Sequence, residues 1–141
     1  MSREAHYTLL DHAADLAVRL RAPSLEALFV EGARALFDLL GTLGSTEPLT
    51  TERIELEGRD LEELFHDWLS ELLFRFSARG ETYCQFRVLA LDPRRLRAEV
   101  AGETLQRKRH TVEREIKAVT YHGLEIVEDE EGWRATLIFD V

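Results

Sequence analysis

Cysteine is almost absent from this sequence: Cys84 is the one thiol among 141 residues. No internal disulfide can therefore form, which is typical of proteins from a reducing compartment. Apolar runs of membrane-spanning length are also missing, and the first residues lack the apolar core of a signal peptide. We therefore expect a cytoplasmic protein that has no membrane partner.

Positive charge is scarce as well. The chain has 18 Lys and Arg residues against 27 Asp and Glu residues, which gives a formal net charge of −9. Such a field opposes direct binding to a nucleic-acid backbone, because like charges repel, and it favours cations or basic protein surfaces. We expect any contact with RNA to be indirect or to run through a partner.

The strong catalytic motifs are missing too. The sequence contains no Gly-x-Gly-x-x-Gly, no P-loop, no Cys-x-x-Cys and no His-Glu-x-x-His. No strand-to-helix nucleophile motif organises its Ser, His and Asp residues. Cys84 falls inside an expected strand, which indicates a packed thiol rather than a nucleophile.

The apolar pattern that is present predicts one α+β domain over residues 1–141. Helical spacing of apolar residues predicts two amphipathic helices, one that follows Ser24 and ends at Gly41, and one that follows Asp60 and ends at Gly80. Alternating apolar residues predict strands at 6–10, 15–21, 53–56, 82–91, 96–100, 116–127 and 133–141. The expected architecture is a two-layer α/β sandwich, in which the helices pack on a mostly antiparallel or mixed sheet.

Two local features of these elements carry further expectations. The continuous Leu and aromatic stripe of the second helix is typical of a hydrophobic core, and a partner-binding groove is the alternative. In the strand at 116–127 the apolar alternation changes phase, which predicts a bulge near His122 and Gly123.

Carboxylates at two distant parts of the sequence are the candidate chemistry. Asp11, His12 and Asp15 precede an expected strand, and Asp140 stands beside the α-carboxylate of Val141. If the two strands are neighbours, Asp15 approaches Asp140 and Val141, and three carboxyl groups together require a cation or a proton. Oxygen ligands select Ca²⁺ or Mg²⁺. A solvated turn at residues 11–15 is the alternative.

A basic stretch is the third candidate. Residues 107–110 read Arg-Lys-Arg-His, and Arg114 and Lys117 follow. Such a patch can contact RNA phosphate or an acidic partner. A solvated loop, balanced by Glu113 and Glu115, is the alternative.

Several motifs together resemble those of the archease family, in order along essentially the whole chain. They are DHAAD at residues 11–15, SLEALF at 24–29, DWLSELLF at 67–74, EIKAVTYHGLE at 115–125 and FDV at 139–141. The combination of the fourth block with the last is specific to that family. Departures are small: the family often has Thr where Ala13 stands and an acid where Gln106 stands, so a role for Gln106 is not expected.

The resemblance implies an accessory protein rather than an enzyme. Archeases assist RtcB-type RNA ligases in tRNA splicing and RNA repair, by promoting guanylylation of the ligase's histidine and multiple turnover. The implied metal ligands are Asp15, Asp140 and Val141, with Ca²⁺ expected and Mg²⁺ or Mn²⁺ as alternatives. His12, Lys117 and His122 are the residues expected to contact the ligase; each has an orienting or structural role as its alternative, which we favour for His122.

Two other functions remain open. A general protein chaperone, or a modulator of RNA-modifying enzymes, is the first, and it predicts several unrelated clients. A metal-dependent phosphoester hydrolase that uses Asp15, Asp140 and His12 is the second. No second candidate base for hydrolysis is found in the sequence.

Overall fold

The computed structural model describes residues 4–10 and 15–141. Its elements, in chain order, are β1 (His6–Leu10), β2 (Leu16–Ala22), α1 (Leu25–Leu40), η1 (Leu43–Ser45), β3 (Thr50–Glu57), α2 (Leu61–Arg79), β4 (Glu81–Asp92), β5 (Arg95–Thr104), β6 (Ala118–Asp129) and β7 (Gly132–Asp140). Every strand expected from the alternation is present, and the α+β class is confirmed.

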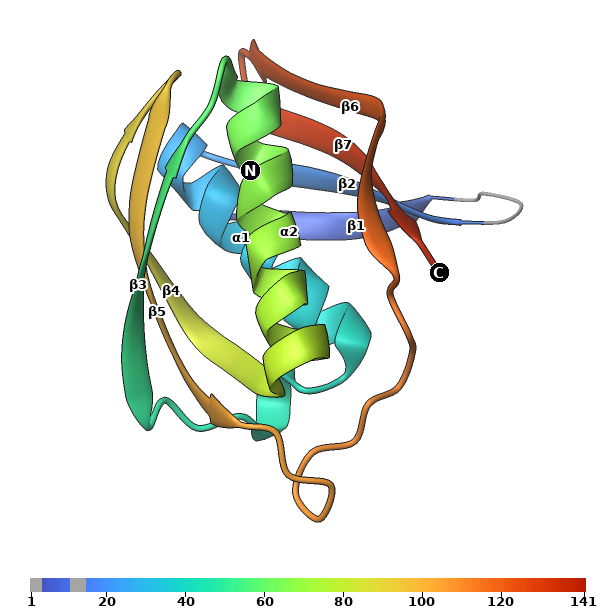
Figure 1. The fold of residues 1–141 in the computed structure, drawn as a ribbon. Coiled ribbons are helices and arrows are strands. Elements are labelled where there is room, and N and C mark those ends of the chain that lie inside the picture. Colours follow the sequence, from blue (N-terminus) through green and yellow to red (C-terminus); the bar gives the residue numbers. More distant parts are fainter. Residues whose placement is uncertain (1–3, 11–14) are drawn as a thin grey trace.

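The strands form two antiparallel sheets rather than one. One sheet has the order β1-β2-β7-β6 and the other the order β3-β5-β4. The two helices lie between them: α1 packs on β2 and β4, and α2 packs on β6 and β4 (Figure 1). Alternation predicts where strands are but not which strands pair, so the division into two sheets was not foreseen.

Both helices begin and end at the expected residues. The Ser24 hydroxyl accepts a hydrogen bond from the backbone N–H of Ala27, and the Asp60 carboxylate accepts one from the N–H of Glu63. Such bonds satisfy backbone donors that the first helical turn leaves unpaired. Gly41 and Gly80 end the helices with positive φ angles of 103° and 65°, where a side chain would be strained.

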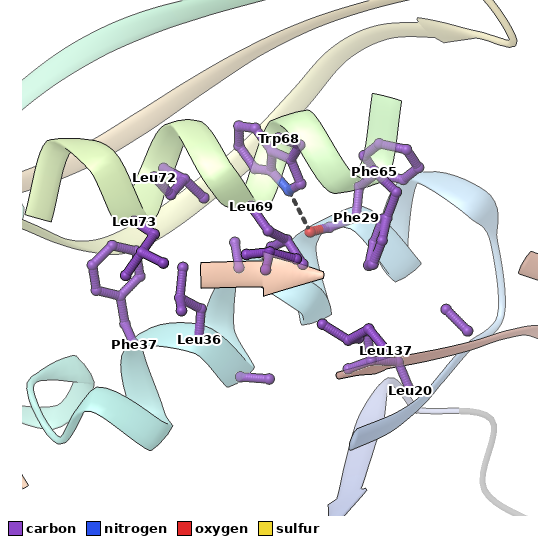
Figure 2. Close-up of a cluster of buried hydrophobic side chains, with 14 of the residues drawn as sticks. Leu20, Phe29, Leu36, Phe37, Phe65, Trp68, Leu69, Leu72, Leu73 and Leu137 are labelled. Atoms are coloured by element: carbon purple, nitrogen blue, oxygen red, sulfur yellow. Dashed lines mark hydrogen bonds between the residues drawn. The ribbon is translucent and has the colours of Figure 1, made fainter. Parts of the chain in front are cut away.

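The stripe of α2 is hydrophobic core, as the sequence indicated. Trp68 is fully buried, and its indole N–H donates to the Phe29 carbonyl of α1 at 2.8 Å. Phe29 and Phe65 meet edge to face, with ring centroids 5.0 Å apart (Figure 2). The helices can come this close because Gly32 has no Cβ. A Cβ at this position would lie 2.7 Å from the Phe65 ring.

The predicted bulge in β6 is confirmed. Pairing between β6 and β7 shifts register between Thr120 and Glu125, and Gly123 has a φ of 69°. The shift divides β6 into two halves that both pair with β7. The first half runs beside the end of the chain at Asp140.

Candidate functional site

Three strand ends meet at one end of the sheet β1-β2-β7-β6. Leu16 pairs with Phe139, so extending the register by one residue places Asp15 opposite Asp140. On the other side of β7, Ala118 pairs with Asp140, and the Lys117 N–H donates to the Asp140 carbonyl at 2.7 Å. The pairing thus gathers Asp15, Asp140 and Lys117, of which Asp15 lies far from the other two in the sequence.

The exposure of these groups suits an outward-facing site. Asp15 is partly exposed, and Asp140, Val141 and Lys117 are exposed. Carboxylates and main-chain oxygens are hard donors, and their chemistry fits Ca²⁺ or Mg²⁺. Within residues 4–10 and 15–141, no three His, Cys, Asp or Glu side chains are grouped to hold a metal ion. A metal site here therefore stays a prediction that depends on Asp15, Asp140 and Val141 together.

The three residues expected to contact a partner have different outcomes. Lys117 lies beside Asp140, as described above. His12 lies outside the described residues. His122 is exposed, two residues beyond the Thr120–Ile138 pair, and no hydrogen bond or ion pair of its side chain is found with the part of the chain that the structure describes. Both interpretations of His122, contact with the ligase and the structural role that we favoured, stay predictions.

A histidine of α2, which the sequence analysis did not single out, holds the first half of β6. Nε2 of His66 lies 2.8 Å from the Val119 carbonyl and donates to it, because a carbonyl oxygen only accepts. Nδ1 lies 2.9 Å from the Asp67 carboxylate. The Tyr121 ring stacks on the imidazole with centroids 3.7 Å apart, and its hydroxyl donates to Asp67 at 3.4 Å.

The assembly of His66, Asp67 and Tyr121 lies near the end of the sheet that carries Asp140, because Val119 pairs with Phe139. Burial, followed by the charge of Asp67, raises the pKa of Tyr121. His66 and Val119 also line a groove of about 330 Å³ that reaches Lys117. The signal in the sequence was the adjacent His-Asp pair in the second helix, on the flank of the apolar stripe. The pair had no assigned partner, because the contact with Val119 spans 53 residues.

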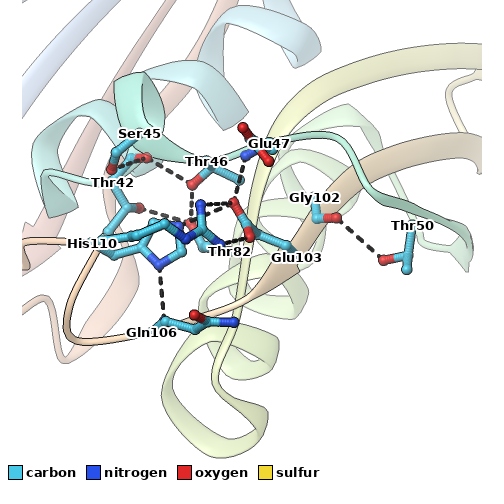
Figure 3. A network of polar contacts seen from close by, with 11 residues as sticks. Thr42, Ser45, Thr46, Glu47, Thr50, Thr82, Gly102, Glu103, Gln106 and His110 are labelled. Atoms are coloured by element: carbon cyan, nitrogen blue, oxygen red, sulfur yellow. Dashed lines mark hydrogen bonds and ion pairs between the residues drawn. The ribbon is translucent and has the colours of Figure 1, made fainter.

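A second polar assembly explains part of the basic stretch. The Glu103 side chain is 3% exposed and forms an ion pair with Arg109. It also accepts hydrogen bonds from the backbone N–H of Glu47 at 2.6 Å and from His110 Nε2 at 3.2 Å. Nε2 of His110 carries the hydrogen, because Nδ1 accepts from the Gln106 N–H at 2.9 Å (Figure 3).

These bonds have an electrostatic consequence. They lower the pKa of Glu103 to about 2, and the hydrogen bond from Arg109 is the largest cause. His110 is thus buried, and Arg109 stays exposed but is paired with Glu103, so the cations of the predicted basic patch that are left without this partner are Arg107, Lys108 and the later ones. In the sequence, Glu103 stands a few residues before the basic run at residues 107–110.

Three buried threonines continue this network toward α1. The Thr82 hydroxyl donates to the Thr42 hydroxyl at 2.8 Å and lies 2.9 Å from that of Thr46. Thr46 in turn donates to the Thr42 carbonyl at 2.7 Å (Figure 3). The Glu113 N–H donates to the Leu40 carbonyl at the end of α1. The segment between β5 and β6 is therefore bonded to the rest of the fold at two places before Lys117: through Arg109 and His110, and then through Glu113.

The described residues include no helix that combines the length and the apolar character needed to cross a membrane.

Comparison with known proteins assigns the chain to a family. The family model described as Archease protein family (MTH1598/TM1083) matches residues 7–141. The Protein archease of Methanopyrus kandleri is 39% identical over 94% of this chain and 96% of its own length. That of Pyrococcus abyssi is 34% identical over the full length of both chains.

Solved structures agree in fold. The solution structure of Methanobacterium thermoautotrophicum protein 1598 matches with a TM-score of 0.78 and 27% identity, over 96% of this chain and 98% of the other. The crystal structure of an archease from Thermotoga maritima, described as a possible chaperone, matches with a TM-score of 0.67 and 20% identity, over 94% of each chain. Taken together with the family model, these matches establish that the chain belongs to the archease family.

Proposed function

We propose that this chain is a cytoplasmic accessory protein that activates an RtcB-type RNA ligase. In this proposal it promotes guanylylation of the ligase's histidine and multiple turnover, in tRNA splicing and RNA repair. The observation that carries the proposal is the convergence of Asp15 and Asp140 at neighbouring strand ends, in a chain of the archease family. Exposed carboxylates at the end of a rigid sheet are well placed to reach a partner's site.

Asp15, Asp140 and Val141 would hold one divalent cation, with Ca²⁺ expected and Mg²⁺ or Mn²⁺ as alternatives. Such an ion supplies positive charge for phosphate oxygens in nucleotidyl transfer. The chain's own residues fix the geometry: pairing with β2 and β6 orients the backbone of Asp140. Lys117, which donates its N–H to Asp140, would present its ammonium group to the partner beside the carboxylates.

The test is reconstitution with purified RtcB-type ligase, GTP, and RNA that ends in a 2′,3′-cyclic phosphate and a 5′-hydroxyl. Substituting Asp140→Asn should lower stimulation of ligation by at least about tenfold, because mutation even of a residue that only orients a metal ligand typically costs about 10–100-fold in affinity or activity. Ca²⁺ should raise the melting temperature of the wild-type chain but not that of Asp140→Asn, since a ligand stabilises only the state that binds it.

Glu130→Gln is the matched control. Glu130 is exposed in the turn between β6 and β7, at the opposite end of the sheet from Asp140. This variant removes the same charge and should leave both the stimulation and the effect of Ca²⁺ unchanged. Full stimulation by Asp140→Asn would refute the assignment of the site.

A general chaperone is the second candidate, favoured by the description of the Thermotoga maritima relative as a possible chaperone. It predicts that a pull-down under native conditions recovers several unrelated client proteins. The ligase proposal predicts a single RtcB-type partner. Turnover of a phosphoester by the purified chain, with no partner present, would instead support a hydrolase.

A further inference from the structure

A groove between α2 and β6 lies next to the candidate cation site but contains none of its expected ligands. It encloses about 330 Å³ and is lined by His66, Ser70, Phe74 and Ser77 of α2 and by residues 117–119. Its apolar walls include Leu73, which is buried. Phe74 is 53% exposed, although the core-facing residues of α2 are almost entirely covered. An exposed aromatic ring beside a groove offers apolar area on which a partner's side chain can pack.

Cations stand at this groove without acidic partners. The Arg79 guanidinium lies 5.6 Å from the centre of the Phe74 ring, and Lys117 lies in the lining. Among the described residues, neither side chain has an ion pair, and no Asp or Glu lines the groove. One cation over the exposed ring and another in the groove lining, neither of them in an ion pair with a described residue, indicate that the occupant carries a carboxylate.

The position of the groove ties it to the cation site. The Lys117 N–H donates to the Asp140 carbonyl, so the groove begins next to the candidate metal ligands. His66 anchors its β6 wall through the Val119 carbonyl, which gives the wall a fixed geometry. A segment bound here would bring its parent protein against Asp140.

We propose that the α2–β6 groove binds a segment of the partner ligase in which an apolar or aromatic side chain stands next to a carboxylate. The apolar side chain packs on Phe74 and Leu73, and the carboxylate pairs with the cations. The inference rests on the proposed function for the identity of the partner, and it separates two tasks: the groove supplies affinity and the carboxylates supply activation. A peptide is favoured over RNA because the acidic chain repels a backbone with a phosphate at every nucleotide far more than a segment with one carboxylate, whose charge the two cations offset.

The experiment measures the affinity of immobilised RtcB-type ligase for variants of the full chain. Phe74→Ser and Lys117→Glu should each raise the dissociation constant by at least about tenfold, as loss of a central contact does. Leu49→Ser and Lys108→Glu are the matched controls, because both residues are exposed and lie outside the groove lining. The controls should bind within about twofold of wild type.

The outcomes separate this inference from the proposed function. Failure of the wild-type chain to bind the ligase would overturn both. Unchanged affinity of Phe74→Ser would overturn the groove proposal and leave ligase activation standing. Because Phe74 is exposed, Phe74→Ser should keep the wild-type melting temperature and the wild-type response to Ca²⁺, and Asp140→Asn should keep the wild-type affinity.

Photocrosslinking identifies the occupant. A benzophenone amino acid placed at Ser77 should form an adduct with a ligase peptide that contains an acidic residue beside an apolar one. An adduct with a basic peptide would overturn the proposed chemistry. So would displacement of the ligase from the groove by a short single-stranded RNA.

Discussion

At the scale of single residues, Glu103 is the most constrained charge in the described part of the chain. A buried carboxylate is costly unless hydrogen bonds and an opposite charge compensate for lost hydration. Here Arg109, His110 and the Glu47 N–H supply that compensation from three directions. The same contacts favour the ionised form, and this is the physical reason for its low pKa.

Glu103 predicts a defined pH dependence of stability. Its pKa is about 2 in the folded chain against an ordinary value of 4.5, so the unfolded chain takes up the proton first as the pH falls. The stability contributed by the ionised group is complete above about pH 4.5 and is lost as the pH falls toward about 2. Glu103→Gln should therefore melt below wild type at neutral pH, and the difference should shrink through this window.

Thermal melts of both chains as a function of pH check this expectation. Glu99→Gln is the control, because Glu99 lies on the same strand but pairs with the exposed Arg53 and Arg87. Exposed ion pairs contribute little, so this variant should stay close to wild type. A difference between Glu103→Gln and wild type that is constant with pH would contradict the proposed role of the charge.

At the scale of elements, β6 is an edge strand that α2 partly covers. Two backbone groups of β6 form hydrogen bonds with α2 side chains: His66 donates to the Val119 carbonyl, and Glu62 accepts from the Ile126 N–H. Covering an edge protects it from pairing with other chains. The first of these bonds also fixes the strand end that carries Lys117 and pairs with Asp140.

His66 provides a test of this anchoring. His66→Ala should lower the free energy of unfolding by about 1–2 kcal/mol, because it leaves a partly buried carbonyl without its donor. His66→Gln, whose amide N–H₂ can donate to Val119, should restore part of that loss. Urea unfolding measures the loss, and hydrogen exchange near Val119 reports on the strand end. Equal destabilisation by both variants would indicate that packing against Tyr121, and not the hydrogen bond, is the dominant contribution.

At the scale of the whole molecule, two sheets share one core through the helices between them. Phe37 of α1 contacts Tyr83 and Phe86 of β4, while Leu20 of β2 and Leu137 of β7 belong to the same buried cluster. Neither sheet has a separate core of its own. This is why the single domain predicted from chain length should unfold as one unit.

Cooperative unfolding is therefore the expected outcome for the wild-type chain. Trp fluorescence reports on the interior through Trp68, and far-ultraviolet circular dichroism reports on both helices and both sheets. The two signals should give the same urea midpoint and the same slope. Two separate transitions would show that the sheets fold independently and would contradict a single domain.

Several features of this fold were predictable because their causes are local. The helix ends at Ser24, Asp60 and Gly80 follow from capping chemistry that acts within one turn. The bulge near Gly123 was found because a phase shift in side-chain alternation is visible within one strand. The motifs shared with archeases were also local strings of residues, so they indicated the family without the tertiary structure.

The site was only partly predictable. Sequence analysis proposed that Asp15 approaches Asp140, and the pairing of β2 with β7 brings these two positions together. It missed His66, since a contact between a helix and a strand 53 residues away has no local signature. It also counted Arg109 and His110 as unpaired surface charge, because only the fold shows that Glu103 pairs with the exposed Arg109 and with the buried His110.

The sequence by itself determined the class of fold, the helix ends, the strand positions and the family, because each is encoded in short-range periodicity or in motifs. The tertiary structure decided how the strands divide between two sheets, which cations stay free and which groups stand beside Asp140. Those features depend on pairings between distant segments, whose energies come from hydrogen bonds and burial formed only when the chain has folded.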